Sequence, residues 1–233
     1  MSNSDVAVEH VHGPELRHHF ADEEQQRQAS SLGMWLFLAT EIMFFGGMFC
    51  AYLIYRLAYF NEFAAASRSI RILPGAINTA VLICSSLTVA LSVRAAQTGK
   101  RKLLIALLGL TLVFGLAFLG IKGVEWYEKY QEHHIPGASF SAADLIQDYP
   151  QLHIDAARAQ IFFSLYFAMT GLHALHMIIG LGIFIWLIYG AWKGRFTPEY
   201  YTPVEIGGLY WHFVDIVWIY LFPLLYLIDR KPL

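Results

Sequence analysis

Five long stretches with almost no charged residues constrain this chain more than any other feature of its sequence. Residues 74–93, 103–121 and 159–192 contain no Asp, Glu, Lys or Arg, whereas 32–55 and 206–228 contain one acid each. A helix needs about 20 apolar residues to cross the hydrocarbon core of a bilayer. The stretches are also too long for strands and lack their alternation. The sequence therefore predicts an all-α membrane protein, a bundle of five transmembrane helices. We place these helices at about 32–56, 73–94, 103–127, 157–191 and 206–229.

The composition agrees with a membrane location. Hydrophobic residues make up 57% of the chain and charged residues 15%, compared with about a quarter charged in an average soluble domain. A chain this short has too little interior to hide so much apolar surface from water.

The charge and the cysteines exclude other kinds of site. The formal net charge of −2 provides no basic surface that would bind nucleic acid. Cys50 and Cys84 lie in separate apolar stretches, without the spacing of a metal or redox site.

The polar segments predict the orientation of the chain. Residues 1–31 are polar, include four histidines and lack the apolar region of a signal peptide, so we interpret them as a cytoplasmic N-terminal tail. Residues 32–230 then form the five-helix transmembrane domain. The segment 94–102 holds four basic residues, which favours the cytoplasmic side, whereas the acidic loop 128–156 suits the outer face. We therefore expect a cytoplasmic N-terminus and a periplasmic C-terminus.

Ionisable side chains inside the predicted spans are the candidate functional residues. Each costs about 3 kcal/mol at the membrane centre unless it is paired or hydrated, so all should face protein. Glu41 lies in the middle third of the first span. The other candidates in or near the spans are Glu125, His173, His176, Glu205, His212 and Asp215.

Helical spacing suggests how these residues are satisfied. His212 and Asp215 are three residues apart on one helix face, and we expect them to hydrogen-bond to one another as a structural lock. His173 and His176 share this spacing, which favours hydrogen bonds to other helices and leaves a metal or haem pair as the alternative. Glu41 has no basic partner nearby on its own helix, so it is protonated, paired across helices or hydrated. Each of these states is compatible with a role of Glu41 in proton transfer or with a contact between Glu41 and a lipid headgroup.

The residues alone do not assemble a reaction. The sequence has no nucleophile beside a base, no glycine-rich phosphate loop and no zinc-ligand spacing. Two other classes remain as alternatives. A proton-coupled transporter would use Glu41 as a relay, but it should have broken helices or inverted repeats, and neither is visible. A haem-binding membrane anchor would use His173, His176 and His212.

Several strings resemble subunit III of haem–copper terminal oxidases, that is, of cytochrome c oxidase and quinol oxidase. They are Trp35–Ala51 (WLFLATEIMFFGGMFCA), Met169–Gly180 (MTGLHALHMIIG) and Leu209–Tyr220 (LYWHFVDIVWIY). Between them, Ile77–Thr88 (INTAVLICSSLT) and Gly123–Tyr130 (GVEWYEKY) also look like that family, in the same order. The similarity covers nearly the whole chain. It is closest to the five-helix bacterial form, because two N-terminal helices of the seven-helix form are not predicted, and lipid sites that depend on them should differ.

The resemblance implies a non-catalytic subunit of an aerobic respiratory oxidase in the bacterial cytoplasmic (inner) membrane. Such a subunit binds no haem or copper, which belong to partner subunits. It contacts the catalytic subunit I directly, accompanies subunit II and a small subunit IV, and can join a respiratory supercomplex. It stabilises subunit I, binds phospholipid and supports proton uptake during oxygen reduction. Glu41 and Glu125 with its neighbours favour an aa3/caa3-type cytochrome c oxidase over a bo-type quinol oxidase.

The resemblance also implies roles for individual residues. Glu41 and Glu125 match family acids linked to lipid or protons. Lys193 and Arg195, near the inner end of the fourth predicted helix, could meet lipid phosphates. The residues expected to brace the bundle are His173, His176, Glu205, His212 and Asp215.

Overall fold

A computed structural model describes residues 20–228 of the chain, and every regular element in this part is helical. Five helices are long and apolar enough to cross a membrane, which confirms the predicted all-α membrane fold. They are α1 (Glu23–Ala58), α3 (Ile72–Gln97), α4 (Arg101–Gln131), α6 (Ala156–Trp192) and α7 (Thr202–Tyr226). The connections add three short elements: α2 (Phe60–Ser69), α5 (Ala143–Asp148) and the 3-10 helix η1 (Pro150–Leu152).

Most helix ends lie beyond the predicted apolar stretches, above all at the start of the first helix, whereas α7 ends at Tyr226 rather than near residue 229. Helix α1 begins at Glu23 rather than near residue 32. Its N-cap Asp22 accepts a hydrogen bond of 2.6 Å from the backbone N–H of Gln25, so a polar turn precedes the apolar run. The predicted polar tail 1–31 therefore includes the first turns of a membrane helix. The four tail histidines, His10, His12, His18 and His19, lie outside the described residues.

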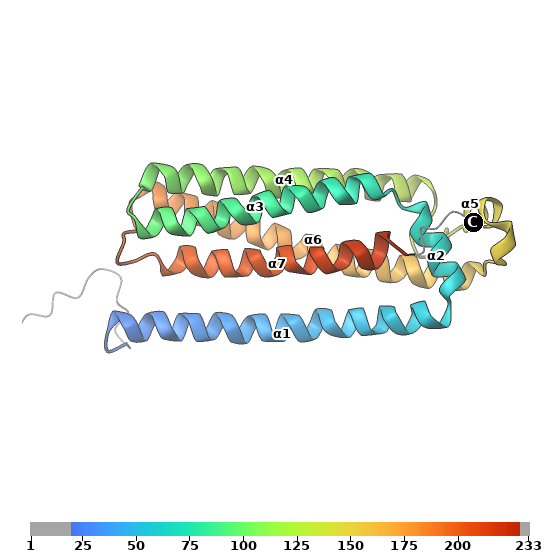
Figure 1. Ribbon diagram of the computed structural model, residues 1–233, viewed down its shortest axis with the longest axis horizontal. Helices are drawn as coiled ribbons and strands as arrows, with labels where there is room; N and C mark the ends of the chain where they lie inside the picture. The colour runs from blue at the N-terminus through green and yellow to red at the C-terminus, as the bar shows by residue number, and fades with distance from the viewer. Residues whose placement is uncertain (1–19, 229–233) are drawn as a thin grey trace, which may run out of the picture.

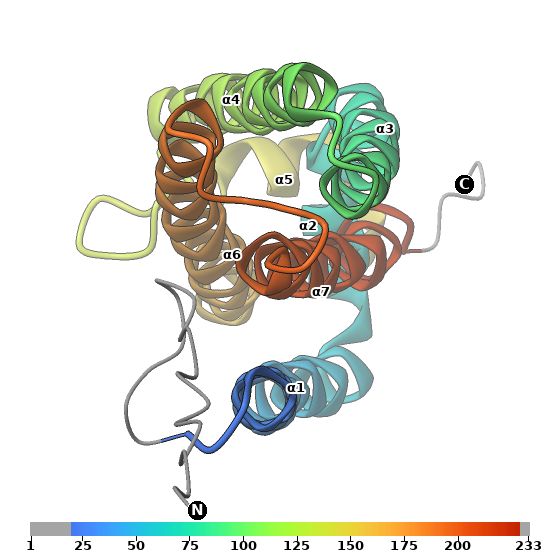
Figure 2. The same cartoon turned by 90° about the vertical axis from the view of Figure 1, so that its left-hand side faces the viewer.

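Four of the long helices surround a common core, and the fifth lies outside it. Figure 2, which looks along the bundle, shows α3, α4, α6 and α7 around one axis and α1 beside them. Helix α1 runs along α7 and α6, and α2 crosses the end of the bundle to connect α1 with α3 (Figure 1). The two ends of the described chain lie at opposite ends of the bundle, as an odd number of spans requires. The membrane side that each end faces stays a prediction.

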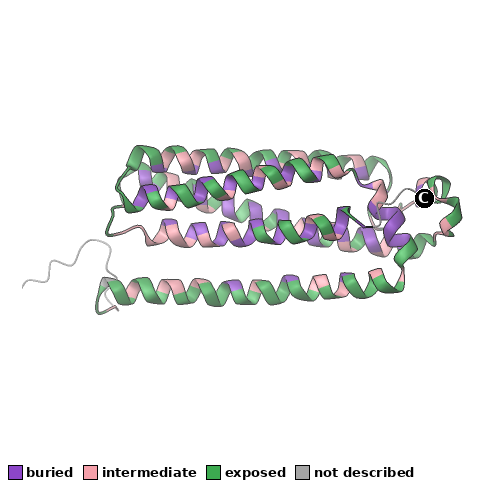
Figure 3. Ribbon diagram, in the orientation of Figure 1, coloured by how far each residue is buried: buried purple, intermediate pink, exposed green. Residues whose placement is uncertain are grey.

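Helix α1 has the most exposed surface of the bundle. Figure 3 shows α1 mostly exposed along its length, whereas α7 alternates between buried and exposed positions. Large apolar side chains on α1 point outward, among them Leu32, Met43 and Leu57, which are 72%, 78% and 83% exposed. An apolar groove of about 520 Å³ separates part of α1 from α7, lined by residues such as Ile42, Phe45 and Ile216. This helix therefore offers apolar surface on both sides.

The four-helix core closes around Trp211 on α7. Its indole N–H donates a hydrogen bond of 2.9 Å to the Ser85 hydroxyl on α3. Two glycines make room for the ring, because a Cβ atom would lie 2.7 Å from it at Gly180 on α6 and 2.9 Å from it at Gly115 on α4. Such distances are shorter than any normal contact, so glycine at these positions lets the helices approach closely. Trp211 thus contacts all three neighbouring helices of the bundle.

Polar contacts fasten both ends of the bundle. At the end where α1 begins, Arg101 donates hydrogen bonds to the backbone carbonyls of Ala191, at 2.8 Å, and of Trp192. This contact fixes the α3–α4 turn to the last turn of α6. At the other end, the buried His134 faces Glu132 at 3.2 Å and Asp144 at 3.0 Å, which fastens the long loop between α4 and α6.

Candidate functional site

Polar side chains inside the bundle form separate contacts, and the first joins the two helices that meet at its edge. Glu41 lies near the middle of α1, and its Oε2 atom is 3.2 Å from Nε2 of His176 on α6. The other ring nitrogen, Nδ1, is 2.8 Å from the carbonyl oxygen of Leu172. A carbonyl only accepts hydrogen bonds, so Nδ1 carries a hydrogen. The structure therefore confirms one of the three states expected for Glu41, pairing across helices.

This geometry leaves Nε2 of His176 facing the carboxyl group of Glu41, and a hydrogen bond between the two atoms needs one hydrogen on either partner. The side chains of Glu41 and His176 are 19% and 12% exposed, so the pair opens to the outer surface of the bundle. It can contact a polar group at this depth.

A second cluster is fully enclosed near the C-terminal end of α7. Oε1 of Glu125 accepts hydrogen bonds from Lys122 at 2.8 Å, from Tyr226 at 2.6 Å and from Tyr166. The Lys122 ammonium also lies 3.0 Å and 2.6 Å from the two tyrosine oxygens, which uses all three of its N–H groups. Lys122 and Glu125 are 2% and 3% exposed. The cluster thus connects α4, α6 and α7 without an opening to a ligand.

Sequence reasoning missed Lys122. It singled out Glu125 as an acid linked to lipid or protons, but a cation buried three residues before it was not considered. The signal was available, since residues three apart on a helix are neighbours, and a basic residue inside an apolar span needs an acidic partner. The contacts around Glu125 are structural, and its role in lipid binding or proton uptake stays a prediction.

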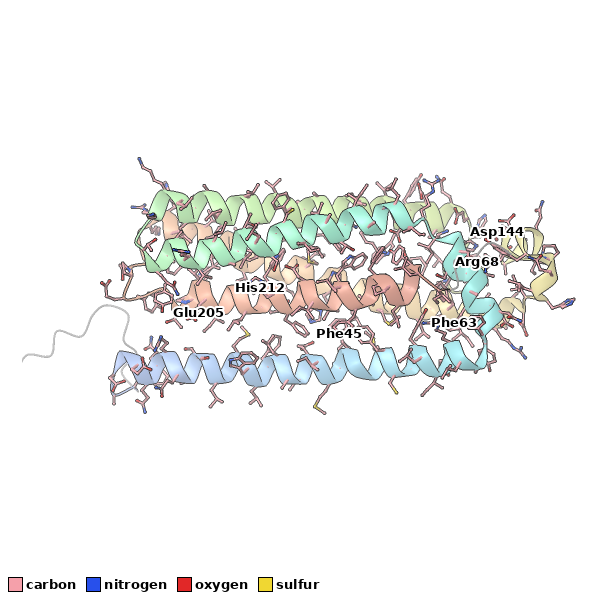
Figure 4. The ribbon with its side chains drawn as sticks, viewed as in Figure 1. Phe45, Phe63, Arg68, Asp144, Glu205 and His212 are labelled. Atoms are coloured by element: carbon pink, nitrogen blue, oxygen red, sulfur yellow. The ribbon has the colours of Figure 1, made fainter. Side chains whose placement is uncertain are left out.

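The expected lock between His212 and Asp215 is wrong. His212 Nδ1 instead contacts the Ser86 hydroxyl on α3 at 2.7 Å. Within the described chain, neither carboxylate oxygen of the buried Asp215 has a hydrogen-bond partner. A spacing of three residues puts two side chains on one helix face, but it does not point them at each other, and the neighbouring helix supplies a closer partner. Figure 4 shows His212 on α7.

The two histidines of α6 differ in their contacts. His176 is bonded across helices, as expected, but neither ring nitrogen of His173 has a hydrogen-bond partner among the described residues. His173 is buried between the rings of Phe118 and Trp218, each with its centroid 5.3 Å away. The expectation of a hydrogen bond between helices is therefore wrong for His173. Its ring packs as an aromatic side chain.

The remaining candidates lie at one end of the bundle, apart from the mid-membrane contacts. Glu205 is in the first turn of α7, and Figure 4 shows it well away from Phe45, which neighbours the Glu41–His176 pair. Lys193 and Arg195 follow the end of α6 and are exposed, and the Lys193 ammonium lies 4.5 Å from the centre of the Tyr189 ring. This position suits interfacial phosphate contacts, which stay a prediction. Among residues 20–228, no group of three or more His, Cys, Asp or Glu side chains could hold a metal ion.

Comparison with known proteins adds a family relationship to this geometry. The sequence profile of the family described as cytochrome c oxidase subunit III matches residues 15–229. The chain is 32% identical over 200 residues to cytochrome c oxidase subunit 3 of Cyprinus carpio and of Gallus gallus, covering 83% of this chain and 67% of each relative. It is 31% identical over 198 residues to a probable cytochrome c oxidase subunit 3 of Nocardia farcinica (strain IFM 10152), covering 85% of this chain and 87% of that relative.

Proposed function

Because this chain belongs to the cytochrome c oxidase subunit III family, we propose that it is a non-catalytic subunit of an aerobic respiratory oxidase. In this proposal it stabilises the catalytic subunit I, binds phospholipid and supports proton uptake while oxygen is reduced. Haems and copper belong to the partner subunits. The observation that carries the proposal is the family match over residues 15–229, which includes all five membrane helices.

The Glu41–His176 pair supports the proton and lipid parts of the proposal. A carboxyl group that shares one proton with an imidazole can take up or release that proton with a small change in position. The pair is partly exposed at the outer edge of the bundle, where lipid or a neighbouring subunit would contact it. This arrangement fits a supporting role in proton delivery to the complex.

The names of the relatives favour cytochrome c over quinol as the electron donor of the complex. We therefore infer an aa3/caa3-type oxidase in the bacterial cytoplasmic membrane, with subunits I and II and a small subunit IV as partners. Membership of a respiratory supercomplex is part of the same inference. The alternative is subunit III of a bo-type quinol oxidase, which differs in the donor that the whole complex oxidises.

Purification of the intact complex tests the proposal. The chain should be affinity-tagged in its own cells, extracted in mild detergent and analysed for co-eluting chains, lipid and visible absorption. We expect a haem- and copper-bearing subunit I to co-elute, and the complex to oxidise reduced cytochrome c. A tagged membrane protein of another complex from the same cells serves as the control.

Three outcomes would contradict the proposal at different levels. A complex that oxidises quinol but not cytochrome c would replace the inferred oxidase type and keep the subunit role. A chain that elutes without an oxidase core would reject the subunit role itself. A Soret band that survives removal of all other subunits would instead support the haem-anchor alternative.

A further inference from the structure

Asp215 is a buried acid for which this chain provides no adequate partner. The residue is 3% exposed, and neither of its carboxylate oxygens has a hydrogen-bond partner among the described residues. The Ser86 hydroxyl lies close to this acid, and it is already in contact with His212 at 2.7 Å. Ser86 carries one hydroxyl hydrogen, so it could serve at most one of the two oxygens. At least one oxygen of Asp215 therefore lacks a donor.

Asp215 borders an open groove, but its two oxygen atoms are covered in the chain alone, so a donor from outside reaches them only if the side chain turns toward the groove. Asp215, His212 and Ser86 line a groove of about 440 Å³ between α3 and α7. Apolar side chains form its rims, and three of them point outward: Ile83 is 56% exposed, Ile216 is 51% exposed and Ile219 is 46% exposed. A polar group thus lies in an otherwise apolar recess on the outer face of the bundle.

The depth of this groove in the membrane restricts what can fill it. Thirteen residues of α7 precede Asp215 and eleven follow it, so it lies close to the middle of the helix. At about 1.5 Å per residue, it is more than about 15 Å from either end, near the midplane of a hydrocarbon core about 30 Å thick. Lipids have only acyl chains at this depth, and these carry no hydrogen-bond donor. A lipid headgroup therefore cannot satisfy Asp215.

We propose that the groove between α3 and α7 is the docking site of a transmembrane helix from another subunit, and that this helix donates a hydrogen bond to Asp215. The inference rests on the proposed function, since it requires that the chain works inside a complex. The partner helix is apolar on the contacting face, with one donor side chain near the midplane: a hydroxyl, amide, indole or cationic group. Polar contacts of this kind join helices in membranes, where apolar surface alone gives no driving force.

A second groove makes this face suitable for a helix. The apolar groove between α1 and α7 shares His212 and Ile216 with the α3–α7 groove. Helix α7 therefore forms a ridge with a recess on each side, and only the α3–α7 recess contains a carboxylate. A partner helix that docked in the α1–α7 recess would find no carboxylate there. The acid favours the α3–α7 groove for the helix that carries a donor.

Photo-crosslinking in the assembled complex tests the location. A photoreactive amino acid should replace Ile83 or Ile219 in the full chain, in native membranes. The control is Leu116, which lies in the middle of α4, is 53% exposed and lines neither groove. We expect both groove positions, but not Leu116, to crosslink to one transmembrane segment of another oxidase subunit. Mass spectrometry should map the attachment to within one helical turn of a donor side chain.

Three crosslinking results would overturn the inference. These are adducts with lipid alone, a partner segment without a donor, and equal crosslinking from Leu116. If the tagged complex still contains subunit I in any of these cases, the proposed function stands and only the docking site is rejected. If no oxidase subunit co-elutes at all, the proposed function itself is rejected.

Substitution of Asp215 tests the donor. Asp215→Leu removes the acceptor, and we expect retention of the crosslinked subunit in detergent to fall about tenfold, equivalent to about 1.4 kcal/mol. Asp215→Asn keeps an acceptor oxygen and the shape of the side chain, so we expect it to keep most of the retention. The crosslinking experiment uses the native aspartate, so misfolding of Asp215→Leu would not affect it. Equal retention in both variants and the unchanged chain would reject the hydrogen bond.

Discussion

At the scale of single residues, the interior acids of this chain are distinguished by what they face. Glu41 faces a histidine on another helix, Glu125 faces a lysine and two tyrosines, and Asp215 borders a groove. All three are acids within membrane helices, yet one pairs with a histidine, one is enclosed in a charge cluster and one lacks a donor. Residue type and depth alone do not separate these roles, because the neighbouring helix supplies the partner.

The Glu41–His176 contact predicts different effects for two substitutions. Glu41→Gln keeps a hydrogen bond to His176 but cannot release a proton, so we expect a normal yield of the complex and a faster loss of activity during turnover. Glu41→Leu also removes the hydrogen bond, and we expect it to lower the bound phospholipid. Thr40→Val is the matched control, since Thr40 is exposed and its hydroxyl bonds only within its own turn. Native lipid content and native inactivation kinetics in both Glu41 variants would exclude a special role.

The Lys122–Glu125 cluster predicts strong coupling between its members. Lys122→Met leaves Glu125 as a buried charge without its cation, and we expect a loss of about 3 kcal/mol in the stability of the complex. Combining it with Glu125→Gln removes the stranded charge, so the double variant should be more stable than Lys122→Met alone. A double-mutant cycle on thermal unfolding in detergent measures this coupling. Additive losses would mean that the two charges do not depend on each other.

At the scale of helices, close packing at glycines holds α6 against α7. A Cβ atom at Gly180 would lie 2.7 Å from the Trp211 ring, whereas one at Gly182, two residues later on α6, would have no atom within 4 Å. We expect Gly180→Ala to destabilise the fold by about 1–3 kcal/mol through overpacking. Gly182→Ala is the matched control, with the same gain in helix propensity and no clash. Equal thermal midpoints for the two variants would show that α6 can move away from Trp211 at no cost.

Helix boundaries also belong to this scale, and they show a limit of sequence reasoning. Apolar runs placed all five membrane helices, but they did not predict α1 from Glu23 or the short helix α2. Helix α2 is ten residues long and mixes polar residues with alanines, so no apolar run marks it. Its buried face, which includes Phe63 and Ala65, exists only because the end of the bundle covers it. Such an element depends on tertiary packing more than on its own sequence.

At the scale of the whole molecule, the distribution of basic residues predicts orientation. The α3–α4 turn and its flanks hold Arg94, Lys100, Arg101 and Lys102, so we expect this end of the bundle in the cytoplasm. In a background without Cys50 and Cys84, Ser139→Cys in the α4–α6 loop should react with a membrane-impermeant maleimide on intact cells. Gln97→Cys at the α3–α4 turn should react only after lysis. The reverse pattern would place the N-terminus outside.

The sequence by itself determined the five membrane helices, the family and the residues that have to be satisfied inside the membrane. These properties depend on local runs of apolar residues and on short strings, which need no knowledge of the neighbouring helices. Only the tertiary structure decided the partners: His176 for Glu41, 135 residues away, and Ser86 for His212, 126 residues away. Helical spacing identifies side chains on one face, but a hydrogen bond needs two atoms within about 3 Å, and between helices that distance is fixed by packing.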